Sequence, residues 1–484
     1  MADKKIYSSL LEELLTVGKL ARDKSQKPFA IAMLKEFLNH LKQQGNVTSS
    51  NVQSFVATRI TQIDDIISSQ LNEIIHDPKF QKLEAAWLGL YYLVSKTKTN
   101  LKLRLRIFNV SKAELFADLM KSPEFDQSEL FKKIYEREYG TFGGQPYSCL
   151  VGDFEFTRSA KDITLLEKIS AVAAAAHAPF ISSAHPQLFD LDGFHQISRP
   201  KDLGKTFQSL ELAKWNSFRN SEDSRYVALV LPRVLMRLPY NNTDELFENG
   251  FHFAEDVNGM DMRHFSWGNA AYVLAERITN AFYWYGWTAA IRGVEGGGLV
   301  EGLPAYAYRT SEGDLVVKCP TEAAITDRRE RELSEQGFIG LCHSKGSDYA
   351  VFFGAQTVQR VRKYEDEDAN ANAVLATRLP YVLAVSRFAH YIKVIMRDKI
   401  GSFISREQIE IELNTWLSNY IILNDDAPQA AKAKYPLREG RIEVSDVPGS
   451  PGSFRAVVYL RPHFQMEELT ASIRLVANLP KTTA

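Results

Sequence analysis

The sequence has few of the features that mark secreted, membrane-spanning or nucleic-acid-binding proteins. Its three cysteines, Cys149, Cys319 and Cys342, lie far apart, so they form no disulfide framework and favour a reducing, cytoplasmic location. No apolar run approaches the roughly 20 residues that a membrane-spanning helix needs, and the acidic residues among the first leucines are untypical of a signal peptide. Lysine plus arginine (58) and aspartate plus glutamate (59) nearly cancel, so the overall charge favours neither nucleic acid nor a cationic partner.

The sequence also lacks the short motifs of common catalytic and cofactor sites. It contains no Gly-x-Ser-x-Gly and no His-Glu-x-x-His, and no Lys-Ser or Lys-Thr pair directly follows the glycine-rich segment 292–302. That segment is typical of a place where two backbones pass closely. Cys319, Cys342 and His343 lack metal-site spacing, and adjacent Cys342 and His343 should point to opposite faces of a strand. We therefore expect a protein that is not an enzyme, with no catalytic residue, cofactor or metal.

The first hundred residues carry apolar stripes at helical spacing, separated by helix start and stop signals. The second, third and fourth stripes fall at 30–41, 52–74 and 80–94, and the first holds Leu10, Leu11, Leu14, Leu15 and Val17. Amphipathic helices of this kind form either a bundle with its own core or an extended arm that docks on another protein. The sequence leaves both interpretations open.

From residue 101 the pattern changes to alternating strands and helices. The segment 101–107 alternates aliphatic and basic residues and predicts a strand, with Lys102, Arg104 and Arg106 on one face. This alternation of elements predicts a layered sheet covered by helices. Further strands are expected at 149–151, 226–231, 287–291, 315–317, 338–341 and 349–353, with helices at 164–178, 269–285 and 327–336.

The last hundred residues predict two helices followed by strands. The first helix, at 381–399, contains His390 among apolar residues, which is typical of a core histidine; Ser405 and Gln408 form a capping box that opens the second. A hairpin is expected at 441–460 and a final strand at 472–479. That strand either closes its own domain's sheet or adds to a sheet in another molecule.

Several long segments carry a resemblance to a known family. They are 214–226 (KWNSFRNSEDSRY), 231–239 (LPRVLMRLP), 267–272 (WGNAAY), 291–304, 318–322 (KCPTE), 325–330 (ITDRRE), 387–391 (RFAHY) and 396–402 (MRDKIGS). In this order they make the chain similar, from about residue 139 to 480, to the large contractile-sheath subunit of the bacterial type VI secretion system, the VipB/TssC family. The first hundred residues match that family only by helical character and position.

The resemblance implies a structural, non-enzymatic protein with a mixed α/β (α+β) contractile-sheath fold. It implies an N-terminal helical region at 1–100, a central layered α/β domain at 101–380 and a small inner α+β domain at 381–484 with an exchangeable terminal strand. Members of the family pair with a small sheath subunit, VipA/TssB, and polymerise on a baseplate around a tube of Hcp. Contraction drives effector delivery, and the AAA+ unfoldase ClpV dismantles the contracted sheath.

The resemblance also implies three sets of candidate site residues. By position, the first helix would bind the unfoldase through Leu10, Leu11, Leu14, Leu15 and Val17, unless this stripe packs against the small subunit instead. The strand exchanged between subunits would use Ile473, Arg474, Leu475, Val476 and Leu479. Candidates for pairing with the small subunit are Leu34, Phe37, Leu38, Phe55 and Ile63.

Two alternatives come from other classes of protein. One is a cytosolic α/β enzyme with its site around Arg292, Glu295 and the glycines of segment 292–302. The other is a nucleic-acid-binding module that uses Lys102, Arg104 and Arg106, for which strongly salt-dependent binding to duplex DNA is expected.

Overall fold

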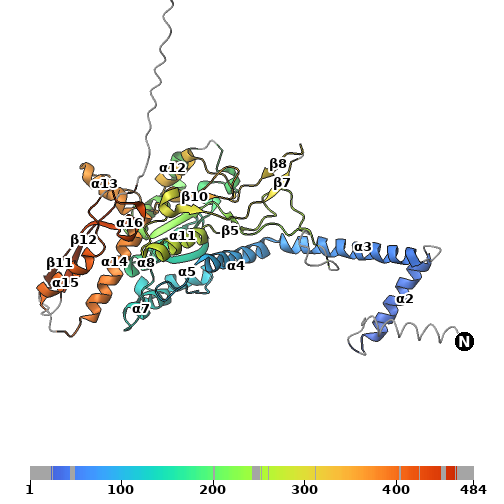
Figure 1. Ribbon diagram of the computed structural model, residues 1–484, viewed down its shortest axis with the longest axis horizontal. Coiled ribbons are helices and arrows are strands. Elements are labelled where there is room, and N and C mark those ends of the chain that lie inside the picture. The colour runs from blue at the N-terminus through green and yellow to red at the C-terminus, as the bar shows by residue number, and fades with distance from the viewer. Residues whose placement is uncertain are drawn as a thin grey trace, which may run out of the picture. The chain divides into compact units, whose positions relative to one another are not determined.

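The computed structural model describes residues 23, 25–43, 49–199, 202–241, 251, 253–259, 261–310, 312–402, 405–424, 426–448, 454–463 and 465 (Figure 1). The chain divides into two compact units, one of residues 1–77 with 239–256 and one of residues 78–238 with 257–484. The described part of the first unit is helical, and the strands belong to the second. Domain boundaries at residues 100 and 380 stay a prediction.

Two amphipathic helices form most of the described part of the first unit. They are α2 (Lys27–Gln43) and α3 (Ser49–Ile75), which fall where the apolar stripes predict helices. Many of their large apolar side chains lie outside: Phe29, Ile63 and Ile66 have exposed fractions of 70%, 55% and 70%. Helices that leave such residues in water are typical of surfaces that another protein covers. The described residues of this unit therefore bury few of these side chains, and the choice between a docking arm and a bundle stays a prediction.

A six-stranded sheet forms the centre of the second unit, in the order β1-β2-β3-β9-β10-β6. β1, β2, β3 and β9 pair in parallel, while β10 pairs antiparallel with both β9 and β6. The strands are β1 (Leu150–Phe156), β2 (Phe180–Ala184), β3 (Val227–Leu231), β6 (Leu299–Val300), β9 (Phe338–His343) and β10 (Ala350–Phe352).

Helices and three small two-stranded sheets surround this sheet. The longer helices are α4 (Pro78–Lys96), α5 (Lys112–Lys121), α8 (Ala160–Ala176), α10 (Ala213–Arg219), α11 (Ala271–Tyr285), α12 (Asp327–Glu335), α13 (Glu367–Ala376), α14 (Leu379–Asp398) and α15 (Arg406–Ser418). Shorter ones are α6 (Glu129–Phe131), α7 (Arg137–Tyr139), α9 (Leu203–Phe207) and α16 (Gln429–Lys434). The small sheets pair β4 (Val234–Leu235) with β5 (Trp267–Gly268), β7 (Ala307–Arg309) with β8 (Leu315–Val317), and β11 (Leu437–Asp446) with β12 (Phe454–Pro462).

Two hydrophobic cores lie on the two faces of the six-stranded sheet, because successive side chains of a strand point in opposite directions. In β3, Val227 and Leu229 join the core that contains α8, whereas Ala228 and Val230 join the core that contains α11 and the start of α14. Every residue of β3 is buried. Burial on both faces explains why this strand appears in the sequence as a continuous apolar run.

β2 is a central strand that the sequence analysis missed. Its sequence is Phe-Ile-Ser-Ser-Ala, and every residue is buried. The hydroxyls of Ser182 and Ser183 donate to carbonyl oxygens of the neighbouring strands, those of Gly152 and Val230, each at 2.9 Å. Buried hydroxyls that are paired in this way cost little free energy. A hydrophobicity pattern cannot show that pairing, so the serines hid the strand.

Two of the predicted strands are wrong. Residues 101–107 belong to no strand, since no described segment pairs with them, and residues 287–291 run irregularly after α11. Trp287 instead stacks on Phe388, with 4.3 Å between ring centres. In both segments the residue pattern could not show whether a neighbouring strand was available for pairing. The other predicted strands of this region, and its three predicted helices, are confirmed to within about two residues, except that β1 extends to Phe156 and α8 begins at Ala160.

The C-terminal part of the second unit has a core of its own, built by α14, α15 and the β11–β12 hairpin. The predicted capping box is present at the start of α15, where Ser405 and Gln408 each accept a hydrogen bond from the other's backbone N–H. The predicted hairpin is present too, with Arg441 opposite Tyr459. His390 is a buried core histidine as expected, and its Nε2 lies 3.0 Å from the carbonyl oxygen of Ala176.

α4 packs against α11 through small residues. Ala85 and Gly89 are on the buried side, and Gly89 lies so close to Tyr272 that an added Cβ would stand 2.4 Å from the ring carbon Cδ2. Close passage of the helix over an aromatic ring therefore requires glycine at this position.

We expect Gly89→Leu to destabilise the packing of α4 on α11. The new side chain has to displace the Tyr272 ring, and overpacking of this kind lowers the free energy of unfolding by about 1–3 kcal/mol. Thermal unfolding of the purified protein measures the loss. Gly296→Leu is the matched control, because nothing lies within 4 Å of a Cβ built at Gly296. Equal destabilisation by the two substitutions would contradict the packing argument.

Candidate assembly surfaces and a buried ionic network

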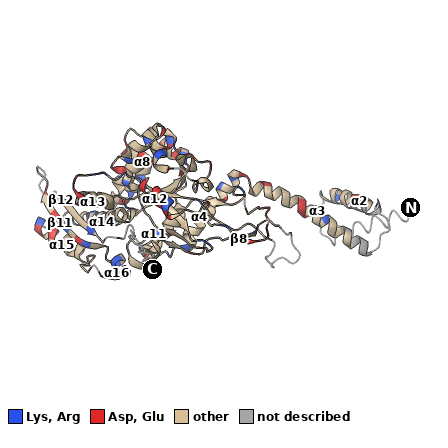
Figure 2. Cartoon of the chain, turned by 90° about the horizontal axis from the view of Figure 1, so that it is seen from above, with Lys and Arg blue, Asp and Glu red and all other residues tan. Residues whose placement is uncertain are grey.

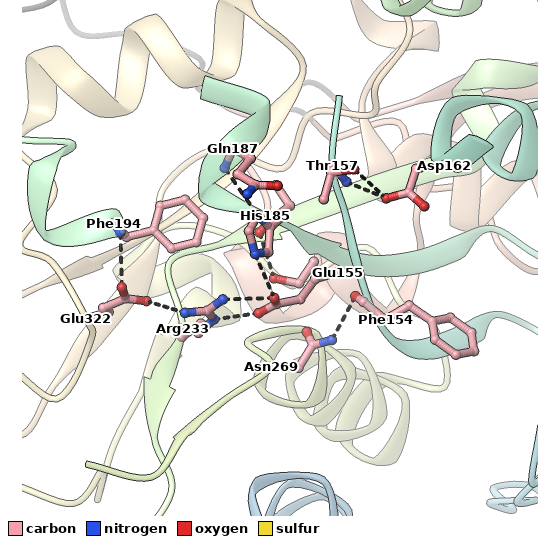
Figure 3. Close-up of polar contacts among 12 residues, drawn as sticks. Phe154, Glu155, Thr157, Asp162, His185, Gln187, Phe194, Arg233, Asn269 and Glu322 are labelled. Carbon is pink, nitrogen blue, oxygen red and sulfur yellow. Dashed lines mark hydrogen bonds and ion pairs between the residues drawn. The ribbon is translucent and has the colours of Figure 1, made fainter. Parts of the chain in front are cut away.

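An ionic network lies at the carboxyl ends of β1, β2 and β3 (Figure 3). Glu155 comes from β1, His185 follows β2, and Arg233 follows β3. Arg233 donates from Nε and Nη2 to the two oxygens of Glu155, at 2.5 and 2.8 Å, and its Nη1 lies 3.5 Å from Oε2 of Glu322. One guanidinium group therefore joins two carboxylates from separate segments.

Burial and pairing act in opposite directions on the titration of this network. Burial raises the pKa of Glu155, but hydrogen bonds from Arg233 together with the positive charges of Arg233, His185 and Lys82 outweigh it, so the pKa lies below its ordinary value. Glu322 keeps a raised pKa, because burial is the largest effect and Arg233 offsets only part of it. Burial also lowers the pKa of His185, whose Nε2 lies 3.8 Å from Glu155. Arg233 is thus the group on which the charge balance depends.

This arrangement is suited to holding segments together. Both carboxylates converge on one cation, and Glu322 also accepts a hydrogen bond from the Phe194 N–H at 3.0 Å. General acid–base catalysis needs two groups whose pKa values are pushed apart beside a bound substrate. Here the groups engage each other and the main chain, so the network ties β1, the end of β3 and the segment around Glu322 into one block.

The glycine-rich segment passes close to β10, as the sequence predicts. Gly297 has a φ of +88°, and a Cβ built at Gly298 would stand 2.6 Å from the carbonyl oxygen of Phe352. Arg292 at the start of the segment is buried. These glycines are explained by backbone proximity, and the alternative of an enzyme site at residues 292–302 gains no support.

Cys319 and His343 lie close together, which the sequence did not predict. Burial alone would raise the pKa of the Cys319 thiol, and the hydrogen bond with His343 helps to lower it below its ordinary value. Cys342 packs into the core that contains α8, on the other face of β9, as expected. Among the described residues, no group of three or more His, Cys, Asp or Glu side chains could hold a metal ion. Within the same residues, no helix combines the length and apolarity that crossing a membrane requires.

The outer face of α4 is an exposed apolar stripe. Aromatic and apolar residues gathered on a surface mark sites of interaction with other proteins. The sequence analysis found the periodicity but did not identify the stripe as a site. The available signal was Ala85 and Gly89, because small residues on one face show that the large residues lie on the other. The stripe consists of Phe80, Leu83, Trp87, Tyr91 and Val94, which are between 39% and 71% exposed.

The predicted site residues are only partly within the described chain. Leu34, Phe37 and Leu38 are half-buried on α2, and Ile63 is exposed on α3. Outside the description lie the side chain of Phe55, the unfoldase-binding stripe (Leu10, Leu11, Leu14, Leu15 and Val17) and the exchange strand (Ile473, Arg474, Leu475, Val476 and Leu479). The roles of all these residues stay predictions.

Two of the three basic residues of segment 101–107 contact other parts of the chain. Arg106 forms an ion pair with Glu138, and Arg104 donates to Gln145 at 3.1 Å. Figure 2 shows positive and negative residues interspersed along the described chain. The nucleic-acid-binding alternative therefore gains no support.

The β11–β12 hairpin has one covered edge and one open edge. α15 covers the outer side of β11, where Asn414 and Glu410 accept hydrogen bonds from the N–H groups of Ile442 and Val444 at 3.0 and 2.9 Å. No other strand among the described residues pairs with β12. The outer edge of β12 is therefore a template for strand addition.

Comparison with protein families decides the class to which the chain belongs. Residues 57–359 match the family described as EvpB/VC_A0108, tail sheath N-terminal domain, and residues 368–479 match its tail sheath gpW/gp25-like domain. The chain belongs to the VipB family of tail sheath proteins. This match confirms the family that the sequence motifs predicted.

A curated relative supports the same family. The type VI secretion system sheath protein TssC1 of Pseudomonas aeruginosa is 45% identical over 480 residues, which cover 98% of this chain and 94% of the relative. Solved structures are similar at a lower level. The anti-feeding prophage baseplate is 10% identical, with a TM-score of 0.36, and the match covers 65% of this chain and 66% of the other. For the contracted PVC sheath of an extracellular contractile injection system, the identity is 10%, the TM-score 0.34 and the coverage 63% and 68%.

We expect Arg233→Met to destabilise the second unit by about 1–3 kcal/mol, because it leaves the buried carboxylate of Glu322 and the half-buried carboxylate of Glu155 without their counter-charge. The loss should be larger near pH 7.5 than near pH 5. In the native protein, the lowered pKa of Glu155 gives stability that is present above its ordinary pKa and is lost on acidification. In the variant, the opposing effect of Arg233 on burial is lost and only the effects of groups such as His185 and Lys82 remain, so the pKa of each carboxyl rises relative to the parent chain, which favours the folded state at low pH.

Chemical unfolding at about pH 5 and about pH 7.5 measures the difference. Arg158→Met is the control, because Arg158 pairs with Asp190 and Glu211 at the surface, where such pairs contribute at most about 1 kcal/mol. A loss of stability for Arg233→Met that is the same at both pH values would show that the carboxylates do not govern it.

Proposed function

We propose that this chain is a structural subunit of a type VI contractile sheath, which pairs with a small VipA/TssB-like subunit and polymerises around a tube of Hcp. The observation that carries the proposal is the tail sheath family match over residues 57–359 and 368–479. The 45% identical relative, which is named a sheath protein, supports it. Contraction of the polymer would drive effector delivery.

In this proposal the protein acts mechanically, in the cytoplasm, and has no catalytic role. The free energy of contraction would lie in subunit interfaces that become larger or better packed, so the chain itself needs no nucleotide site. Three free cysteines are compatible with a reducing compartment.

Strand addition would link neighbouring subunits. No strand in the described part of the chain pairs with the outer edge of β12, and residues 473–479 are predicted to form a strand. Main-chain hydrogen bonds give such a link its affinity, while the segments that flank the strand absorb rotation as hinges. Subunits joined in this way stay connected when they move relative to one another.

The helical surfaces would hold the other partners. The exposed stripe of α4 and the outer faces of α2 and α3 support pairing with the small subunit. The helix predicted at residues 10–17 would be the handle for a ClpV-type unfoldase, and the polymer would start from a baseplate.

Electron microscopy of the chain co-produced with the small sheath subunit tests the proposal. Hollow tubes are the expected result. A monodisperse monomer of this chain that persists in the presence of the small subunit would contradict it.

Removal of residues 472–484 should abolish tubes while the small subunit still co-purifies, because the lost strand links heterodimers and does not form them. Leu475→Pro should act in the same way, since proline lacks the N–H that the ladder needs and fixes φ. Removal of residues 481–484 alone is the control and should leave assembly intact. Long tubes from the larger deletion would show that another segment is the link.

Leu11→Asp combined with Leu15→Asp should leave assembly and contraction intact and block disassembly by the unfoldase. Two charges placed against an apolar groove weaken binding by several kcal/mol, on the order of a thousandfold. Sedimentation of contracted sheaths with unfoldase and ATP measures disassembly, and Ser9→Asp with Thr16→Asp, off the stripe, is the control. If the leucine variant no longer binds the small subunit, the stripe belongs to the heterodimer core and the handle lies elsewhere.

A further inference from the structure

Residues 103–110 run between α4 and α5 without helix, turn, bend or strand pairing. Contacts on both sides hold them in place. Arg104 donates to Gln145 at 3.1 Å and Arg106 donates to Tyr147 at 3.0 Å, while Leu105 packs between them against the cluster formed by α4 and α11. Side chains that alternate between two surroundings at period two are those of an extended strand. This segment has the geometry of a strand without a partner.

The main chain of the segment is unpaired. Asn100 caps its start, where Oδ1 accepts from the N–H groups of Lys102 and Leu103 at 2.7 and 2.9 Å. From residue 104 to residue 110, no main-chain N–H or C=O forms a hydrogen bond with the rest of the described chain. An extended row of free donors and acceptors is a template for a further strand.

We propose that residues 104–110 receive a β-strand from a neighbouring subunit of the assembled sheath, and that this strand alternates acidic and apolar side chains. The inference rests on the proposed function. Lys102, Arg104 and Arg106 share one exposed face, on which Arg106 is already paired with Glu138. Among the described residues no carboxylate pairs with Lys102 or Arg104, and opposite charges on adjacent strands stabilise a sheet. On the other face, Leu101 and Ile107 are 85% and 70% exposed, so apolar side chains of the incoming strand can cover them.

Other occupants fit this surface less well. A second copy of the same segment would place two basic rows across from each other, and like charges in that position destabilise a sheet. The predicted exchange strand at 473–479 contains Arg474 and no acidic residue, so it does not complement the basic face. A helix cannot pair with the row, because its own N–H and C=O groups are already bonded to each other.

Hydrogen exchange in assembled tubes tests the proposal. In tubes formed with the small sheath subunit, about half of the amides of residues 104–110 should exchange about 100-fold more slowly than in a free peptide of the same sequence. Only half are expected to slow, because successive N–H groups point to opposite edges and one edge is paired. Free-peptide rates throughout, in tubes that have formed, overturn this inference and leave the proposed function standing. Absence of tubes overturns the proposed function and the inference with it.

Ile107→Pro and Phe108→Pro are a matched pair of variants, since both side chains are exposed and both substitutions fix φ and remove one N–H. The two N–H groups point to opposite edges, so only one variant deletes a hydrogen bond to the incoming strand. The yield of tubes from one variant should fall about tenfold or more, while the other variant assembles as the parent chain does. Equal yields of tubes from the two variants overturn the proposal that a strand pairs at a single edge.

Lys102→Glu with Arg104→Glu tests the acidic character of the incoming strand. Charge reversal at two cross-strand positions should weaken assembly on the order of tenfold at low salt, and the neutral pair Lys102→Gln with Arg104→Gln should weaken it less. Tube formation that is unchanged by charge reversal overturns the acidic partner.

Discussion

Every row of main-chain N–H and C=O groups in an extended segment has to be satisfied by water, by the chain itself or by another chain. In the six-stranded sheet the chain does this itself, since β2 and β3 have neighbours on both sides. Among the described residues, nothing pairs with the outer edge of β12 or with the main chain of segment 104–110. The paired strands form the buried body of the second unit, and the open rows are the places where another chain can join it.

Apolar side chains follow the same division. The strands of the central sheet bury theirs on both faces, so little is left there for a partner. α4 does the reverse, because Gly89 and Ala85 face inward while Trp87 and Tyr91 are 65% and 71% exposed. α4 therefore packs on its own domain through small residues, and its large apolar residues lie on the exposed face, as is typical of surfaces that bind other proteins. Exposure of the same kind on α2 and α3 makes the helical part of the chain a surface for association.

The sequence predicted the elements whose signals are local. The capping box of Ser405 and Gln408 and the hairpin around residues 441–460 depend on neighbouring residues, and both are present. Prediction from the sequence failed where the decisive contact joins residues that are far apart along the chain. β2 was missed because its serines bond to carbonyl oxygens of β1 and β3, and segment 101–107 was assigned a strand pairing that the described part of the chain does not supply.

The candidate sites divide in the same way. A periodic stripe shows which face of a helix is apolar, but only the position of Tyr272 shows which face of α4 is covered. The ionic network was beyond prediction, because Glu155, Arg233 and Glu322 are brought together only by the order of strands in the sheet. The family, by contrast, was predictable from segments such as 214–226, because long motifs in a fixed order are specific even where each residue's role is unknown.

A subunit that transmits force needs a stiff path between its points of attachment, and α14 provides one within the second unit. Its first turns, with Leu379 and Leu383, lie in the core beside the central sheet, and Phe388 and Ile392 lie in the core beneath the β11–β12 hairpin. Its 20 residues span about 30 Å as one helix. His390 bonds to the carbonyl oxygen of Ala176 in α8 and thereby fixes the helix to a second element midway. In the proposed sheath, a load applied to the edge of β12 would therefore pass through α14 into the central sheet, which the Glu155–Arg233–Glu322 network ties together.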